Sequence, residues 1–205
     1  MISAPEALER LREGNLRYVE ETRSSDTLTG RMRRRAVADA QTPFAVILGC
    51  SDSRVPAEIV FDQGLGDLFV IRVAGNIVAP SQIGSVEFAA ERYGVRLVVV
   101  LGHSSCGAIL ATIEELSRGS KEQSRHLGSI VDRIRPSVQS FIGTSIANDH
   151  DTLVHHAVRA NIRMSANHLR HGSDVLEQLI ENHGLMVVGA EYSLDTGVVE
   201  FFDGL

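Results

Sequence analysis

Four short stretches of the chain are apolar at every position instead of alternating with polar residues. They cover residues 44–48, 68–71, 97–101 and 185–188. A strand that is apolar on both faces is typical of a parallel sheet covered by helices on both sides. A fifth run, 198–202, which is apolar except for Glu200, follows the turn sequence Leu194-Asp195-Thr196-Gly197. Because this turn has hairpin spacing, the run is expected to pair antiparallel with the strand before it.

Helical patterns occupy most of the remaining core. They are predicted at residues 83–93, 106–118, 124–142, 151–170 and 173–182. Together with the strands they predict an α/β fold, in which a central, mostly parallel β-sheet with an antiparallel edge strand is flanked by helices. The chain has 205 residues and no linker, so we expect a single domain over 1–205.

The N-terminal segment is predicted to form a helical arm. Ser3 and Glu6 match a capping box, and apolar residues at helical spacing follow them, which indicates an amphipathic helix over residues 4–20. A polar stretch separates this helix from the first core strand. We therefore expect an arm over 1–40 that lies against another subunit, ahead of an α/β core over 41–205.

Charge and hydropathy limit the possible partners. The chain has 26 acidic and 20 basic residues, a net charge of -6, and lacks the basic footprint that nucleic-acid binding requires. The cluster Arg31, Arg33, Arg34 and Arg35 is interpreted as a solvated surface turn or a subunit contact. No apolar run approaches the roughly 20 residues that span a bilayer, and the N-terminus lacks the apolar region of a signal peptide. We expect no membrane association and a cytoplasmic location.

The residues best suited to chemistry follow two of the predicted strands. Cys50 comes directly after the first strand, and His103 and Cys106 follow the third. The carboxyl ends of parallel strands share one sheet edge, where α/β proteins bind ligands. Two thiolates and one imidazole suit Zn²⁺, and three protein ligands leave an open position, as in catalytic zinc sites. The alternatives are inert buried residues, or a closed structural site with a remote fourth ligand such as His126 or His183.

Two further residues beside Cys50 suggest how such a site works. Asp52 can accept a hydrogen bond from zinc-bound hydroxide and so turn the oxygen lone pair toward a substrate. Arg54 can hold Asp52 by a bidentate pair and keep it ionised. The alternative is a purely structural ion pair in a turn. If Arg54 released Asp52, the carboxylate could itself take the fourth metal position.

These motifs resemble those of the β-class carbonic anhydrases. They are Cys50-Ser51-Asp52-Ser53-Arg54 and His103-Ser104-Ser105-Cys106-Gly107, and the resemblance covers about 41–192. It implies zinc on Cys50, His103 and Cys106, with Asp52 and Arg54 as the catalytic pair. It also implies a carbonate dehydratase, a lyase that reversibly hydrates carbon dioxide to bicarbonate and a proton. Hydrolysis of carbonyl sulfide or carbon disulfide at the same site, or a non-catalytic zinc-binding regulatory module, remain alternatives.

The same resemblance implies a substrate pocket and an oligomer. Gln41 matches a pocket amide that positions substrate, and Phe69 and Phe88 match apolar wall positions. The stretch Arg72-Val73-Ala74-Gly75-Asn76 is similar to the family's strand-to-loop signature. Members of this family are built on dimers, often paired into tetramers, with active sites at the dimer interface. A homodimer or homotetramer is therefore expected.

One position departs from the pattern of some bacterial members. Those members are inhibited by bicarbonate in a side pocket formed by a Trp, an Arg and a Tyr. Arg72 and Tyr192 match two of these positions, whereas Ile47 stands where the Trp is expected. We therefore expect Asp52 to stay off the metal at neutral pH.

Overall fold

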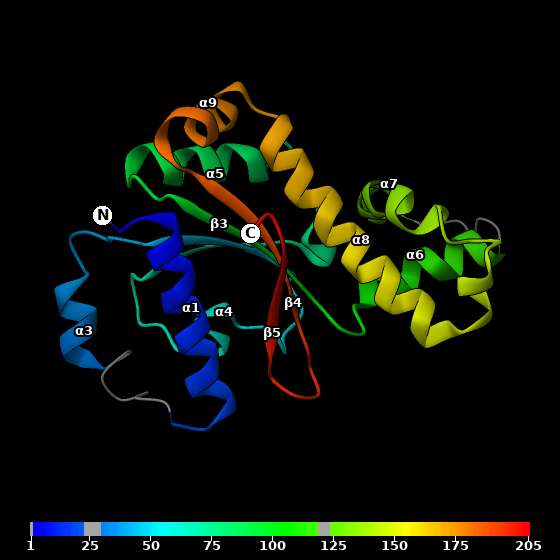
Figure 1. Cartoon of the computed structure of the whole chain (residues 1–205), viewed down its shortest axis with the longest axis horizontal. Helices are drawn as coiled ribbons and strands as arrows, with labels where there is room; N and C mark the ends of the chain where they lie inside the picture. The colour runs from blue at the N-terminus through cyan, green and yellow to red at the C-terminus, as the bar shows by residue number, and fades with distance from the viewer. Residues whose placement is uncertain (1, 23–29, 119–123) are drawn as a thin grey trace.

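The computed structural model of the chain describes residues 2–22, 30–118 and 124–205. Its centre is a five-stranded sheet with the strand order β2-β1-β3-β4-β5 (Figure 1). The neighbouring pairs are parallel except β4 and β5, which are antiparallel. This arrangement confirms the predicted fold class. The strands are β1 (Ala45–Gly49), β2 (Leu68–Arg72), β3 (Leu97–His103), β4 (Met186–Tyr192) and β5 (Val199–Asp203).

Helices cover both faces of the sheet (Figure 1). The helices are α1 (Ala4–Val19), α3 (Arg31–Ala36), α4 (Ala57–Val60), α5 (Pro80–Arg92), α6 (Gly107–Arg118), α7 (Arg125–Gln139), α8 (His150–His171) and α9 (Asp174–His183). Two short 3₁₀ turns lie at Ala74–Asn76 and Ser145–Asn148. The five predicted core helices are confirmed to within three residues at each end. In the arginine cluster, the sequence predicted a turn and the structure forms the short helix α3.

The strand residues alternate between two apolar layers, as the pleat of a sheet requires. Val46, Leu48, Val98 and Val100 face a layer built mainly by α5 to α9. Ile47 and Val99 point to the opposite face, where α1 and α4 pack. Both layers are buried, which explains why the strands are apolar at every position. In the described part of the chain, no helix is long and apolar enough to cross a membrane.

Helix α1 lies against the sheet of its own chain. The predicted capping box is present, because Ser3 Oγ accepts from the Glu6 amide and the Glu6 carboxylate accepts from the Ser3 amide. Leu8 and Leu11 of α1 are buried in the same layer as Ile47. The apolar stripe of this helix is thus buried within its own chain. Residues 23–29 of the predicted arm lie outside the described residues.

Gly14 sets the close approach of α1 to the rest of the fold. A Cβ at this position would collide with the main-chain oxygen of Phe61, so replacement with alanine must push the helix outward. We expect Gly14→Ala to lower the free energy of unfolding by about 2 kcal/mol, although alanine favours an isolated helix. Urea denaturation measures the change.

Gly128→Ala in α7 is the matched control for this substitution. Gly128 is partly exposed inside a helix, and a Cβ there meets nothing within 4 Å. Only the helix propensity changes, so we expect a gain of up to about 1 kcal/mol. A gain of similar size for Gly14→Ala would contradict the tight contact between α1 and Phe61.

Candidate metal centre

Two loops at the carboxyl edge of the sheet bring the predicted ligands together. Cys50 directly follows β1, and His103 is the last residue of β3. The two strands are paired in parallel, with Gly49 opposite Leu101, so their ends lie side by side. Cys106 comes three residues later, immediately before α6. Between the two β3-derived ligands, Ser105 has a φ of 54°, a left-handed conformation that turns the loop back sharply.

The ligand atoms lie at distances suited to a single metal ion. One ligand atom each from Cys50, His103 and Cys106 lie within 4.8 Å of one another, and all three residues are buried. The two Sγ atoms are 4.0 Å apart, and both cysteines are free thiols. Tetrahedral zinc with sulfur at about 2.3 Å needs a sulfur–sulfur separation of roughly 3.8 Å. The cluster therefore fits zinc with little movement of the side chains.

The imidazole of His103 is prepared to act as a ligand. Its Nδ1 lies 2.9 Å from the Ser104 main-chain oxygen, which can only accept, so Nδ1 carries the proton. Its Nε2 is buried and has no hydrogen-bond partner among the described residues. A buried nitrogen lone pair without a partner costs free energy, and a metal ion in the cluster removes this cost. Metal-binding histidines commonly make this kind of Nδ1 bond to a backbone oxygen.

Without a cation, the two thiols compete for one negative charge. The hydrogen bond from Cys106 lowers the pKa of Cys50. The same bond raises the pKa of Cys106, and burial raises it further. Metal ions bind thiolates, so a divalent cation in the cluster would let both sulfurs ionise.

Asp52 and Arg54 form the bidentate pair that the sequence predicted. Arg54 donates from Nε to Oδ1 of Asp52 at 2.9 Å and from Nη2 to Oδ2 at 2.7 Å. The Arg54 main-chain amide also donates to Oδ1 at 3.0 Å. These bonds hold the pKa of Asp52 well below its usual range. Oδ2 of Asp52 lies 3.8 Å from Nε2 of His103, so the carboxylate stands beside the metal cluster.

Arg72 holds the loop that carries these groups. Its Nε donates to the main-chain oxygen of Cys50 at 3.1 Å, and its Nη2 donates to that of Asp52 at 2.5 Å. Tyr192, the other residue matched to a bicarbonate side pocket, is buried, and its hydroxyl lies 3.1 Å from that of Tyr18. Ile47, at the position where the Trp is expected, is fully buried in the apolar layer beneath α1 and α4, on the other face of the sheet from Cys50. The guanidinium of Arg72 and the hydroxyl of Tyr192 therefore both have hydrogen-bond partners within the protein.

The three predicted pocket residues lie away from the cluster within one chain. Gln41 precedes β1, so the five-residue strand, about 17 Å long, separates it from Cys50. Its amide donates to the Tyr93 hydroxyl at 2.9 Å. The rings of Phe69 and Phe88 pack against Tyr93, with centroid distances of 6.1 and 5.7 Å. Phe88 is 51% exposed, so this aromatic cluster is partly open on the surface.

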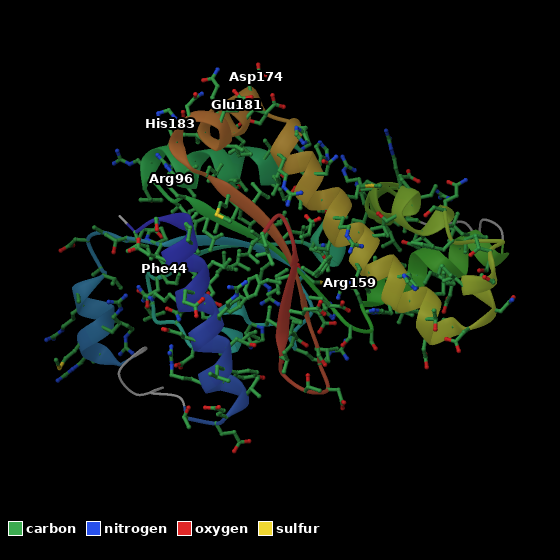
Figure 2. All side chains as sticks on the ribbon, viewed as in Figure 1. Phe44, Arg96, Arg159, Asp174, Glu181 and His183 are labelled. Carbon is green, nitrogen blue, oxygen red and sulfur yellow. The ribbon has the colours of Figure 1, made fainter. Side chains whose placement is uncertain are left out.

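A cavity of about 460 Å³ adjoins this second group of residues. It is lined by Gln41, Phe44, Tyr93 and Arg96, among others. Figure 2 shows Phe44 and Arg96 on the side of the molecule that is far from α6 and α7. The cavity thus lies beyond the amino ends of β1 and β3, whereas the metal cluster lies at their carboxyl ends.

Sequence reasoning missed two hydrogen bonds that support the metal ligand Cys50. The Gly75 main-chain amide donates to Sγ of Cys50 at 3.4 Å. Asn161, on α8, donates from Nδ2 to the Gly75 main-chain oxygen at 2.8 Å. The available signal was an asparagine on the inward, otherwise apolar face of a predicted helix, which demands a buried hydrogen-bond partner.

Comparison with known proteins agrees with this geometry. The sequence profile described as "Carbonic anhydrase" matches residues 45–199. The chain is 37% identical over 191 residues to carbonic anhydrase 2 of Mycobacterium tuberculosis, which covers 93% of this chain and 89% of that relative. It is 38% identical over 196 residues to a carbonic anhydrase of Mycolicibacterium smegmatis, covering 95% and 91%.

The fold is also that of solved members of the same family. A crystal structure from a study of two tetrameric β-carbonic anhydrases of Sordaria macrospora aligns with a TM-score of 0.73 at 22% identity. The alignment covers 82% of this chain and 84% of that one. At this identity the likeness concerns the fold alone, whereas the profile and the bacterial relatives carry the assignment. The sequence match over three quarters of the chain, together with the cysteine and histidine cluster, shows that this chain belongs to the β-carbonic anhydrase family.

Proposed function

We propose that this enzyme reversibly hydrates carbon dioxide to bicarbonate and a proton, with zinc held by Cys50, His103 and Cys106. The observation that carries the proposal is the buried imidazole of His103, which offers a ligand atom within 4.8 Å of two thiol sulfurs and whose Nε2 has no hydrogen-bond partner in the described part of the chain. Three donors of this kind are what a catalytic zinc site uses, with one position left for solvent. When bound, zinc supplies a Lewis acid that makes a water molecule reactive near neutral pH.

Asp52 and Arg54 are proposed to orient the reacting water. The Asp52 carboxylate remains ionised because Arg54 binds both of its oxygens. An ionised carboxylate can only accept, so its Oδ2 takes a hydrogen bond from the proton that the reacting oxygen keeps. The oxygen lone pair then points toward carbon dioxide. The same bidentate pair holds Asp52 back from the metal, which supports the expectation that the carboxylate does not become a ligand.

The substrate pocket is proposed to come from a second copy of the chain. Gln41 precedes β1 and Phe69 pairs with Val46 near its start, whereas Cys50 follows the end of the strand, so most of a strand length separates them from their own metal ligands. Phe88 and the rings around it are exposed, and a surface aromatic cluster is typical of an interface. The Sordaria macrospora proteins are tetrameric, which supports a dimer-based assembly here.

Mixing two inactive variants tests the shared pocket. Cys50→Ser removes a metal ligand, and Gln41→Ala removes the pocket amide. In a mixed dimer, one of the two sites pairs an intact metal cluster with an intact Gln41. We therefore expect carbon dioxide hydration to rise at least several-fold when the two variants are co-refolded, compared with either one alone.

The control uses both substitutions in one chain. Co-refolding the double variant with Cys50→Ser leaves no intact metal cluster in either partner, so no recovery is expected. If the Cys50→Ser and Gln41→Ala mixture stays as inactive as this control, although mass spectrometry shows mixed oligomers, the pocket is not shared between chains.

The proposed reaction is tested directly by stopped-flow carbon dioxide hydration against pH, with zinc content measured on the same sample. Carbonyl sulfide and carbon disulfide are assayed beside it, because the same pocket could admit these linear molecules. Turnover that is fastest with carbon dioxide supports the proposal. Stoichiometric zinc without carbon dioxide hydration between pH 7 and 9 would replace it by a non-catalytic zinc module.

A further inference from the structure

The turn after β2 makes a hydrogen bond to Cys50, one of the proposed metal ligands. Its residues, Ala74–Asn76, form a 3₁₀ turn directly after Val73. The Gly75 amide donates to Sγ of Cys50 at 3.4 Å, within the range of a hydrogen bond to sulfur. This bond approaches the cluster from the protein side. It therefore bears on the properties of the sulfur.

The turn holds an unfavourable backbone conformation in a confined space. Gly75 has a φ of 69° and Asn76 a φ of 42°, two consecutive left-handed residues of which only the first is a glycine. A Cβ on Gly75 would lie 2.7 Å from Cδ1 of Ile134 and 3.1 Å from Cβ of Ala108. Such a conformation persists only where neighbouring groups hold it, and it is common beside functional sites.

Asn161 is the side chain that holds this turn. It lies on the inward face of α8, where its neighbours Ile162 and Val158 are core residues, and it is 2% exposed. Its Nδ2 donates to the Gly75 main-chain oxygen at 2.8 Å. That oxygen belongs to the peptide between Gly75 and Asn76, whereas the amide on Cys50 belongs to the peptide before Gly75. Asn161 thus anchors one side of Gly75 while the other side contacts the sulfur.

We propose that Asn161 is a positioning residue for the metal centre, which aims the Gly75 amide at the Cys50 sulfur. Burying an amide in an apolar layer is unfavourable unless its hydrogen bonds are made, so a purely apolar residue would suit this face of α8 better for packing alone. The asparagine places a donor where the left-handed turn needs one. The inference rests on the proposed zinc site, because the sulfur matters as a ligand.

The expected consequence is electronic as well as geometric. A hydrogen bond to a thiolate withdraws electron density from sulfur, so the metal keeps more of its positive charge. Partners of metal ligands that act in this way typically change metal affinity or activity by about tenfold or more when removed. Loss of Asn161 should therefore be visible in the metal–sulfur bond itself.

The test replaces zinc by cobalt, whose bond to sulfur gives a charge-transfer absorption band. Asn161→Leu removes the donor at similar volume, and Asn161→Ala removes it with less risk of overpacking. We expect the sulfur-to-cobalt band of either variant to move to lower energy, because the sulfur has lost a donor. Competition with a chelator should show a metal affinity about tenfold weaker than in the wild type, because the turn no longer holds the Cys50 sulfur in position.

Ser165→Ala is the matched control. Ser165 is another buried polar residue on α8, one turn beyond Asn161, so the substitution perturbs the same helix without touching Gly75. It should leave the cobalt band in place. A folded Asn161 variant with the wild-type band and affinity would overturn the proposal, since a merely structural role lowers stability without moving the band.

Failure of the wild type to bind cobalt and failure of the variants to fold each lead to a separate conclusion. Wild-type protein that binds no cobalt contradicts the metal site and hence the proposed function itself. Should neither Asn161 variant fold, wild-type protein loaded with cadmium-113 gives the answer by NMR. A scalar coupling between the metal and the Gly75 amide proton supports the proposal, and its absence overturns it.

Discussion

Replacing Cys50 with serine is expected to abolish both zinc binding and carbon dioxide hydration. The neutral hydroxyl of serine is a poor substitute for a thiolate, and the described residues place three protein donors in the site, so the loss of one is severe. Without the metal, the reacting water returns to an ordinary pKa, far above about 7. Activity should therefore fall by at least about 10³-fold, to the uncatalysed background. Zinc content by mass spectrometry and stopped-flow hydration, measured on one preparation, check both effects.

Ser53→Ala is the control in the same loop. Ser53 is exposed and lies between the two members of the carboxylate and guanidinium pair, so its replacement tests whether any change in this loop disturbs the site. It should keep one zinc per chain and most of the activity. A Cys50→Ser protein that kept stoichiometric zinc would show that the metal sits elsewhere.

Replacing Asp52 with alanine is expected to separate metal binding from turnover. The carboxylate contacts Arg54 and stands 3.8 Å from Nε2 of His103, but it is not one of the three clustered donors. Zinc should stay bound. Misorientation of a reacting group typically costs about 10²-fold or more, so kcat should fall by about 10² to 10³. Stopped-flow rates normalised to zinc content give the value.

Asp132→Ala makes the same chemical change at a surface pair. Asp132 is 70% exposed and lies 3.4 Å from Arg135, and exposed pairs of this kind contribute little. This variant should match the wild type. Full activity in Asp52→Ala would remove Asp52 from the reaction and leave its bond to Arg54 as a loop-stabilising contact only.

The strands could be predicted from sequence because their burial on both faces leaves a continuous apolar run. Their ends could not, since backbone pairing continues after the apolar run stops. The register of β3 and β4 extends to His103 opposite Tyr192, through the polar Glu191. Glu191 remains in the strand because it is paired with Arg159 of α8, which Figure 2 shows near β5. Helix α4 has only four residues, too few to produce a periodic pattern.

The metal ligands were predictable because they lie at or just after the ends of two strands, and neighbouring parallel strands end on the same side of the sheet. The positions of Gln41, Phe69 and Phe88 could not be derived in the same way. Their distance from the metal ligands depends on the length of β1 and on the packing of α5 beside it, which motif spacing does not encode. The hydrogen bond from Asn161 to Gly75 joins residues 86 positions apart, so only the folded chain reveals it.

The separation of the two cysteines along the chain has a consequence for folding. Cys50 and Cys106 are 56 positions apart, and a metal ion held by both closes this segment into a loop. A clip of this kind restricts the unfolded chain, which stabilises the native state in the way that a cross-link does. The ion would then cross-link the ends of the paired strands β1 and β3. Chelation should therefore increase backbone opening in these strands before it does so in the edge strands β2 and β5.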